Sequence, residues 1–161
     1  MQIAIMYNLR NGKGSFKGII GECMLKLTDK DMVVTKFFNK NKYILIFGKY
    51  FSKEQLDFIK LNWFSIDAIK IHFEGGKKLC LYEIKTKNRY DNPKPFWLTK
   101  FTQETNEMYR KALSFGFEVK VATVWLLDNW DYEIELEDFQ SAKYCIDKPK
   151  PYDLSARGRS V

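Results

Sequence analysis

The chain has 161 residues, of which 45% are hydrophobic and 16% aromatic, and this composition excludes intrinsic disorder as its main state. We expect one domain over residues 1–146 and a mobile basic tail over 147–161. No apolar run approaches the roughly 18 residues of a membrane span, and the first ten residues lack the layout of a signal peptide. These features predict a cytoplasmic protein without a membrane partner.

The positive charge is spread unevenly along the chain. The formal net charge is +7, from 27 basic and 20 acidic residues. Seven bases stand against two acids between residues 77 and 100, whereas residues 128–138 hold six acids and no base. This separation predicts a polyanionic partner at the basic region, with the acidic block facing away from it. A plain solvated face is the alternative reading of each charge run.

Cysteine and histidine are too sparse for a zinc site. The chain has three cysteines, Cys23, Cys80 and Cys145, and one histidine, His72, without zinc-ligand spacing. We expect the cysteines to be reduced and mostly buried, and His72 to be a structural or surface residue.

In the first third of the chain, apolar spacing predicts a helix over residues 16–27 with Ser15 as its N-cap and Glu22 on its flank. Residues 31–38 and 43–47 are interpreted as two strands joined by a turn over 39–42. Ser52 and Gln55 have the spacing of a capping box, which predicts a helix ending near Asn62.

A hairpin over residues 66–87 carries the charged residues that matter most. A three-residue loop, 74–76, supplies the glycines that such a turn needs, and it pairs Asp67 with Glu83. A two-residue loop would instead send Asp67 to the opposite face. Glu83 and Lys85 are two residues apart in a strand and share a face. The three-residue loop therefore predicts two carboxylates and an ammonium in one cluster.

This cluster has the chemistry of a hydrolytic metal site. Carboxylates can bind a hard divalent cation, and a lysine can orient a water molecule or stabilise developing negative charge. A chance pair of solvated side chains is the competing interpretation. The strand is apolar on both faces before Glu83, however, so charges at its end need a reason.

The rest of the chain predicts a loop over 88–95, a helix over 99–115 ended by Gly116, and strands over 118–127 and 132–136.

The order of the predicted helices and strands, with D-x(15)-E-x-K on a hairpin, resembles the PD-(D/E)xK nuclease superfamily over residues 13–139. Lys17-Gly18 before Glu22, and Phe115-Gly116 before Glu118-Val119, are similar to the archaeal Holliday junction resolvases. The implied fold class is α/β, a restriction-endonuclease-like mixed central sheet flanked by helices with an αβββαβ core.

The resemblance also implies site residues. Asp67, Glu83, Lys85 and Glu22 match the catalytic positions, and Mg²⁺ or Mn²⁺ would be bound by Asp67, Glu83, Glu22 and the backbone carbonyl of Ile84. Ile66 stands where the name-giving motif has proline. The position of the resolvases' active-site serine is open between Thr35, Ser52 and Ser65.

The expected function is that of a metal-dependent DNA endonuclease with a preference for branched DNA. A homodimer is expected, because a two-fold dimer presents two sites to a two-fold junction. The residues expected to contact DNA are Arg10, Lys13, Lys17, Lys87, Arg89 and Lys94. Two alternatives stay open: a nuclease acting on linear double-stranded DNA, and a non-catalytic DNA-binding protein on the same fold.

Overall fold

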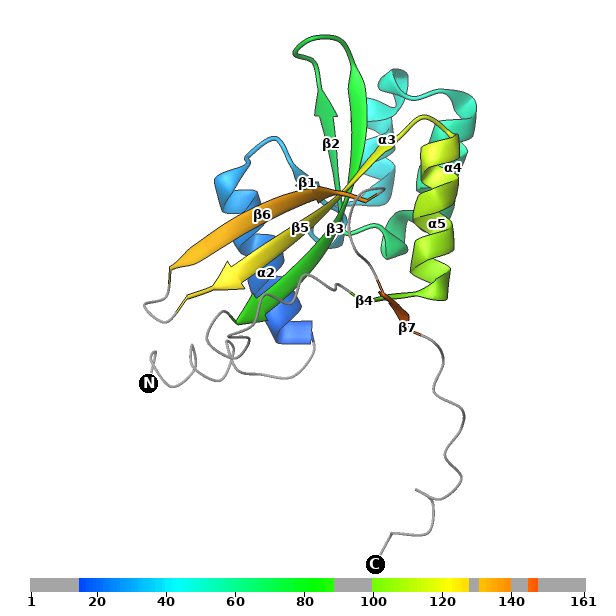
Figure 1. Ribbon diagram of the computed structural model, residues 1–161. Helices are drawn as coiled ribbons and strands as arrows, with labels where there is room; N and C mark the ends of the chain where they lie inside the picture. The colour runs from blue at the N-terminus through cyan, green and yellow to red at the C-terminus, as the bar shows by residue number, and fades with distance from the viewer. Residues whose placement is uncertain (1–14, 89–99, 128–130, 140–144, 148–161) are drawn as a thin grey trace, which may run out of the picture.

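The computed structural model describes residues 15–88, 100–127, 131–139 and 145–147. Figure 1 shows its helices and strands. In chain order the helices are α2 Ser15–Thr28, α3 Lys40–Phe47, α4 Lys53–Asn62 and α5 Gln103–Ser114, with 3₁₀ turns at Thr35–Phe37, Gly48–Tyr50 and Trp63–Ser65. The strands are β1 Val33–Val34, β2 Ala68–His72, β3 Lys78–Asn88, β4 Lys100–Thr102, β5 Glu118–Leu126, β6 Tyr132–Asp138 and β7 Cys145–Asp147.

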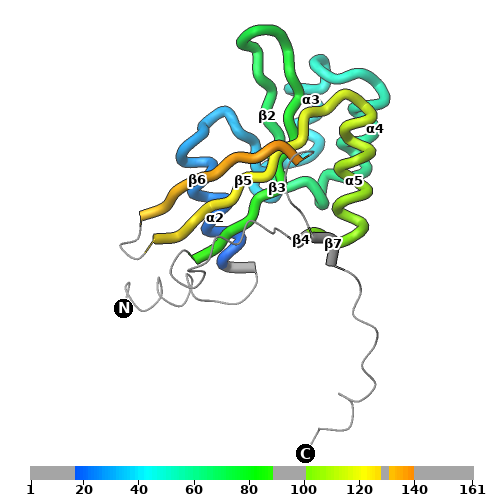
Figure 2. The backbone as a smooth tube through the Cα atoms, viewed as in Figure 1, coloured from blue at the N-terminus to red at the C-terminus, as the bar shows by residue number. Residues whose placement is uncertain are grey.

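Five strands form a mixed sheet in the order β1-β2-β3-β5-β6. β3 and β5 are parallel, and the other neighbouring pairs are antiparallel. Parallel strands need a crossover, which here contains β4 and α5. The chain path in Figure 2 shows the β2–β3 hairpin extending well beyond the other strands at one end. The predicted mixed α/β class is confirmed, and the restriction-endonuclease-like core stays a prediction.

Each face of the sheet has its own apolar core, because side chains alternate along every strand. On one face, Leu25 of α2 packs with Ala68, Tyr82 and Ala122 of the sheet. On the other, Phe58 of α4 and Tyr109 of α5 pack with Leu81 of β3. Figure 1 shows α2 crossing behind the strands, with α4 and α5 standing together at the side of the sheet. The domain is therefore built in layers, and its central strands are covered on both faces.

Short-range signals at helix ends behave as the sequence predicts. Ser52 accepts a hydrogen bond from the Gln55 backbone N–H, and the Gln55 side chain returns one to Ser52, so the capping box of α4 is confirmed. Gly116 follows α5 with a φ of +86°, a left-handed conformation that suits glycine. The helix predicted over residues 16–27 is confirmed as α2; Ser15 is its first residue rather than the residue before it.

The strand predicted over 31–38 is confirmed only in part, and the strand predicted over 43–47 is wrong. Only Val33–Val34 forms a strand, and Lys40–Phe47 is the helix α3. A short apolar run such as 43–47 is compatible with either period, so the pattern alone could not decide. The missed signal is Asn39, whose side chain accepts a hydrogen bond from the Lys42 N–H at 3.0 Å and caps the helix.

The helix predicted over 99–115 begins too early. Residues Lys100–Thr102 form β4, which pairs in parallel with β7, and α5 starts at Gln103 with Thr102 as its N-cap. Asp147, where the tail was expected to begin, pairs with Thr102 at the end of β7. The remaining tail, the first fourteen residues and the turn at 128–129 lie outside the described residues.

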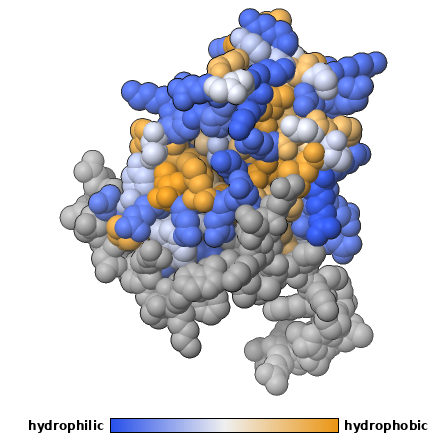
Figure 3. Space-filling model, turned by 45° about the horizontal axis from the view of Figure 1, so that its top comes forward, coloured by the Kyte–Doolittle hydropathy of each residue, from blue (hydrophilic) through white to orange (hydrophobic). Residues whose placement is uncertain are grey.

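The surface is mixed in polarity. Figure 3 shows apolar patches bordered by hydrophilic side chains on one face of the molecule. The large apolar side chains that are most exposed among the described residues include Phe64, Leu45, Leu61 and Leu27. Cys23 is exposed, contrary to the expectation of mostly buried cysteines, whereas Cys80 is buried. Within the described ranges, none of the helices has both the length and the apolar character needed to span a membrane.

Candidate active site

The β2–β3 hairpin has the predicted register. His72 pairs with Lys78 and Ala68 with Tyr82, so the next pair in the same register is Asp67 with Glu83. Gly75 and Gly76 both have positive φ, at 70° and 106°, as the three-residue loop requires. The Asp67 carboxylate accepts a hydrogen bond of 2.8 Å from the Ile84 backbone N–H. The turn glycines therefore place Asp67 at the end of β3 where Glu83 emerges.

Glu83 is a buried carboxylate with two partners. Only 7% of its surface is exposed. Its Oε1 atom lies 2.9 Å from Lys85 Nζ, and its Oε2 atom accepts a 2.7 Å hydrogen bond from the Tyr109 hydroxyl on α5. Lys85 Nζ also lies 5.2 Å from the ring centroid of Phe101. Strand pairing and α5 thus hold Glu83 and Lys85 in one place.

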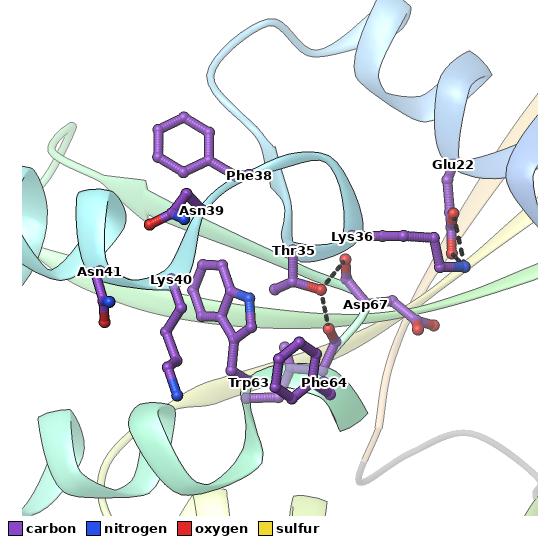
Figure 4. Close-up of a pocket in the computed structure, with 11 residues that line it drawn as sticks. Glu22, Thr35, Lys36, Phe38, Asn39, Lys40, Asn41, Trp63, Phe64 and Asp67 are labelled. Carbon is purple, nitrogen blue, oxygen red and sulfur yellow. Dashed lines mark hydrogen bonds and ion pairs between the residues drawn. The ribbon is translucent and has the colours of Figure 1, made fainter.

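Glu22 reaches the same region from α2. It is 4% exposed, and both of its oxygens accept hydrogen bonds from Lys36 Nζ, at 2.9 and 3.1 Å. The preceding residue, Gly21, lets α2 approach β3 closely, since a Cβ there would lie 1.9 Å from Thr86 Oγ1. Figure 4 shows Lys36 crossing to Glu22, with the Asp67 side chain on the same side of the pocket.

A pocket of about 460 Å³ opens beside these residues. Glu22 and Asp67 lie at its wall together with residues from the segment before α3 and from the turn before β2. Its lining is Glu22, Thr35, Lys36, Phe38, Asn39, Lys40, Asn41, Trp63, Phe64, Ile66 and Asp67. The lining combines two carboxylates, two lysines and three aromatic rings, so it can bind a charged ligand that also has flat apolar faces.

Thr35 holds the backbone that carries Asp67. Its hydroxyl donates to the Ile66 carbonyl and lies 3.2 Å from the Asp67 carbonyl, and its N–H donates to the latter at 3.0 Å. Of the three candidates for the resolvase serine, Thr35 is therefore the one in the pocket. Ser52 caps α4, and Ser65 is exposed in the turn before β2.

Burial and the neighbouring carboxylates perturb Asp67. Burial raises the pKa of Asp67 to about 7, and the neighbouring Glu83 and Glu22 carboxylates also raise it, against the Ile84 N–H and Lys85, which lower it. Burial likewise raises the pKa of the Tyr109 hydroxyl, and the Glu83 carboxylate adds to this effect, so Tyr109 is a hydrogen-bond donor rather than a base. A site that disfavours its own negative charge is stabilised when a cation binds.

The donor set is that of a hard cation, since all three acids offer carboxylate oxygens. In the part of the chain that the structure describes, however, no three His, Cys, Asp or Glu side chains are grouped closely enough to hold a metal ion. Lys36 and Lys85 bind the oxygens of Glu22 and Glu83 instead. The residues fit Mg²⁺ or Mn²⁺ in chemistry, and a cation bound there competes with two lysines. Ile84 contributes its N–H to Asp67, while its carbonyl role stays a prediction.

The predicted DNA contacts fall mostly outside the described residues, as Arg10, Lys13, Arg89 and Lys94 do. Lys17 is in α2 and Lys87 is in β3. Lys87 Nζ lies 5.7 Å from the Trp125 ring centroid, and burial and Lys85 lower the pKa of its ammonium group. Lys17 and Lys87 remain candidate DNA contacts.

The acidic block does not face away from the site. In the β3–β5–β6 register, Val121 pairs with both Glu83 and Glu137, and Thr123 pairs with both Lys85 and Glu135. Residues paired across a sheet point to the same face, so Glu135 and Glu137 share the face of Glu83. The site therefore has an acidic flank at β6 and a basic flank at residues 36–42.

Two residues of the site were missed by sequence reasoning. Lys36 contacts Glu22 only through the tertiary fold, and no local signal marks it. Tyr109 is buried in α5, where a phenol needs a hydrogen-bond partner, and that need was the available signal. His72 lies on the sheet face opposite Asp67, with its Nε2 atom 3.3 Å from the Tyr82 hydroxyl.

Comparison with protein-family models, with curated proteins and with solved structures gives no match to this chain. The function is therefore inferred from the residues of the site alone.

Proposed function

We propose that this protein is a metal-dependent DNA endonuclease that hydrolyses phosphodiester bonds. The observation that carries the proposal is the convergence of Asp67, Glu83 and Lys85 on one hairpin end, with Asp67 opposite Glu83 in register. The raised pKa of Asp67, about 7, supports it, because strongly perturbed acids in a pocket are typical of functional sites.

In this proposal Asp67 and Glu83 hold the metal and Glu22 extends its ligand set. The metal, Mg²⁺ or Mn²⁺, would lower the pKa of a water molecule and neutralise charge growing on the phosphate. Tyr109 orients Glu83 through its 2.7 Å hydrogen bond. Lys85, which lies 2.9 Å from Glu83, is placed to hold the attacking water or the scissile phosphate.

DNA is the proposed substrate because the accessible charge beside the pocket is positive. From Met32 to Lys53 the chain has five lysines and no acid, and two of them, Lys36 and Lys40, line the pocket. Phosphate contacts of this kind give affinity that falls with salt but little sequence selectivity. A preference for branched DNA and a homodimeric form are part of the proposal, by analogy with the resolvase resemblance.

The test is a cleavage assay with a four-way junction, a linear duplex and single-stranded DNA, each with Mg²⁺, with Mn²⁺ and with EDTA. We expect cuts only with a divalent cation, and fastest in the junction. Equal rates on junction and linear duplex would favour the general duplex nuclease. Sedimentation at micromolar concentration tests the dimer.

A non-catalytic DNA-binding protein is the second candidate. It is favoured by the two ion pairs that already occupy Glu22 and Glu83. Metal-independent binding to DNA without cleavage under any of these conditions would establish it in place of the nuclease.

A further inference from the structure

Phe64 is an aromatic side chain that the fold leaves in water beside the candidate active site. It is 91% exposed, although it stands only three residues before Asp67 and lines the same pocket. Its neighbour Trp63 is 2% exposed and packs against Tyr43, with 5.2 Å between ring centroids. Trp63 thus anchors the turn, and the exposed Phe64 follows it in the pocket lining, where Figure 4 labels both residues.

A single exposed apolar residue is ordinary on a protein surface. The surroundings of Phe64 make this one different. Lys40 Nζ lies 5.8 Å from the Phe64 ring centroid, and Lys42 Nζ lies 5.9 Å from the ring centroid of Phe38, which also lines the pocket. An aromatic ring with a neighbouring ammonium group matches a nucleotide, whose base can stack on the ring while its phosphate contacts the lysine.

The charge of the two flanks selects the side from which a nucleic acid can approach. At β6, Glu133, Glu135 and Glu137 follow one face of the strand, and no base lies within Tyr132–Asp138. On the other flank, residues 32–53 have only positive charge. A phosphate backbone is repelled from β6 and attracted to the α3 side, where Phe64 stands.

We propose that Phe64 stacks on an unpaired base next to the scissile phosphate, so that the protein selects DNA in which a nucleotide is unstacked. This stacking role rests on the proposed nuclease function, because a phosphate is scissile only if the protein cleaves DNA. In a continuous duplex each base is covered by its neighbours, and its flat face is unavailable to Phe64. A fork, flap or junction has a base whose flat face is exposed.

The binding test uses EDTA, so that no cleavage occurs. The probes are a forked duplex with 2-aminopurine at the first unpaired position and a linear duplex of the same sequence. We expect quenching of 2-aminopurine by the unmodified protein on the fork. Phe64→Ala should remove the quenching and reduce the fork-to-duplex affinity ratio by about 5- to 150-fold, the range for one stacked base. Phe64→Trp should preserve both.

Leu61→Ala is the matched control, since Leu61 is 80% exposed on α4 and does not line the pocket. It should change neither the quenching nor the ratio. If Phe64→Ala kept the fork-to-duplex ratio of the unmodified protein, the inference would be overturned. A shift from dimer to monomer in sedimentation without loss of quenching would also overturn it, and would make Phe64 a contact between copies of the chain.

Failure of this inference is distinguishable from failure of the proposed function. Cleavage with Mg²⁺ by both the unmodified protein and Phe64→Ala, at an unchanged fork preference, would refute stacking and retain the nuclease. Quenching that depends on Phe64 without any cleavage would refute the nuclease and retain the stacking site on a DNA-binding protein.

Discussion

The side of β3 that faces α5 has two halves with opposite chemistry. Leu79 and Leu81 are buried in the apolar core, whereas Glu83 and Lys85, further along the same face, carry charge. Burying a leucine stabilises the fold by about 1.5–3 kcal/mol. Burying Glu83 costs free energy that Tyr109 and Lys85 offset through hydrogen bonds and charge. One half of the strand therefore stabilises the domain, and the other half holds the charged residues to which we assign the proposed chemistry.

The difference between the two halves of β3 is tested most strongly at Glu83. Glu83→Gln keeps the shape and an acceptor for Tyr109 but removes the charge that would hold a metal. We expect cleavage to fall by at least about a thousandfold, while DNA binding persists because the phosphate contacts come from lysines. Initial rates and binding isotherms measure the two effects. Glu107→Gln on the exposed face of α5 is the control and should cut normally. Normal cutting by Glu83→Gln would refute the site assignment.

Leu81 should show the opposite behaviour. Leu81→Ala removes a fully buried side chain and should reduce the free energy of unfolding by about 2–5 kcal/mol. Urea unfolding measures the loss. At a temperature where the variant is still folded, its metal-dependent cleavage should stay within a few-fold of the unmodified rate. A large loss of cleavage in the folded variant would mean that the two halves of β3 are not separable.

Gly21 links the packing of α2 against β3 to the position of Glu22 in the site. Gly21→Ala places a methyl group against Thr86, whose Oγ1 atom is buried without a hydrogen-bond partner among the described residues. We expect a loss of about 1–3 kcal/mol in unfolding free energy, together with reduced cleavage as α2 and Glu22 shift. Gly18→Ala, in the same helix with no atom within 4 Å of the new Cβ, is the control and should be neutral or stabilising. Equal stability of the two variants would contradict the close approach.

Asp67 should make the stability of the fold depend on pH. Its pKa is about 7 in the folded protein, against about 3.9 for an unfolded chain, so the folded state holds its proton longer. Stability is full below about pH 4 and falls as the pH rises through 4–7. Asp67→Asn removes this loss, so with EDTA its Tm should exceed that of the unmodified protein above pH 7, and the difference should become smaller as the pH falls toward 4. A Tm difference that does not change with pH would mean that it does not come from the titration of Asp67.

The two flanks of the site differ in charge, and this difference bears on the proposed binding of DNA. Charge runs in the sequence predicted an attraction to polyanions, but they did not show where each run would lie. The tertiary register places Glu135 and Glu137 on the same face as Glu83. In our proposal the basic flank at residues 36–42 is therefore the approach side for a phosphate backbone, a role that the sequence had given to lysines and arginines elsewhere.

The sequence by itself determined the features that depend on neighbours in the chain. The glycines at 75 and 76 mark the hairpin turn, and the three-residue loop that they allow pairs Asp67 with Glu83, while the two-residue alternative was excluded only by the structure. Ser52 and Gln55 set the start of α4, and Gly116 marks the end of α5. Turns and caps are satisfied by atoms a few residues apart, so they can be deduced without the rest of the fold.

Only the tertiary structure decided the features that join distant segments. The pairing of β4 with β7, the ion pair from Lys36 to Glu22 and the Tyr109 hydrogen bond to Glu83 all depend on long-range packing. The helix at Lys40–Phe47 is an intermediate case, because its apolar run fits either a helix or a strand and only its Asn39 cap is a local signal. A buried carboxylate likewise takes its partner from whichever donor the fold brings within reach, and sequence spacing does not encode that proximity.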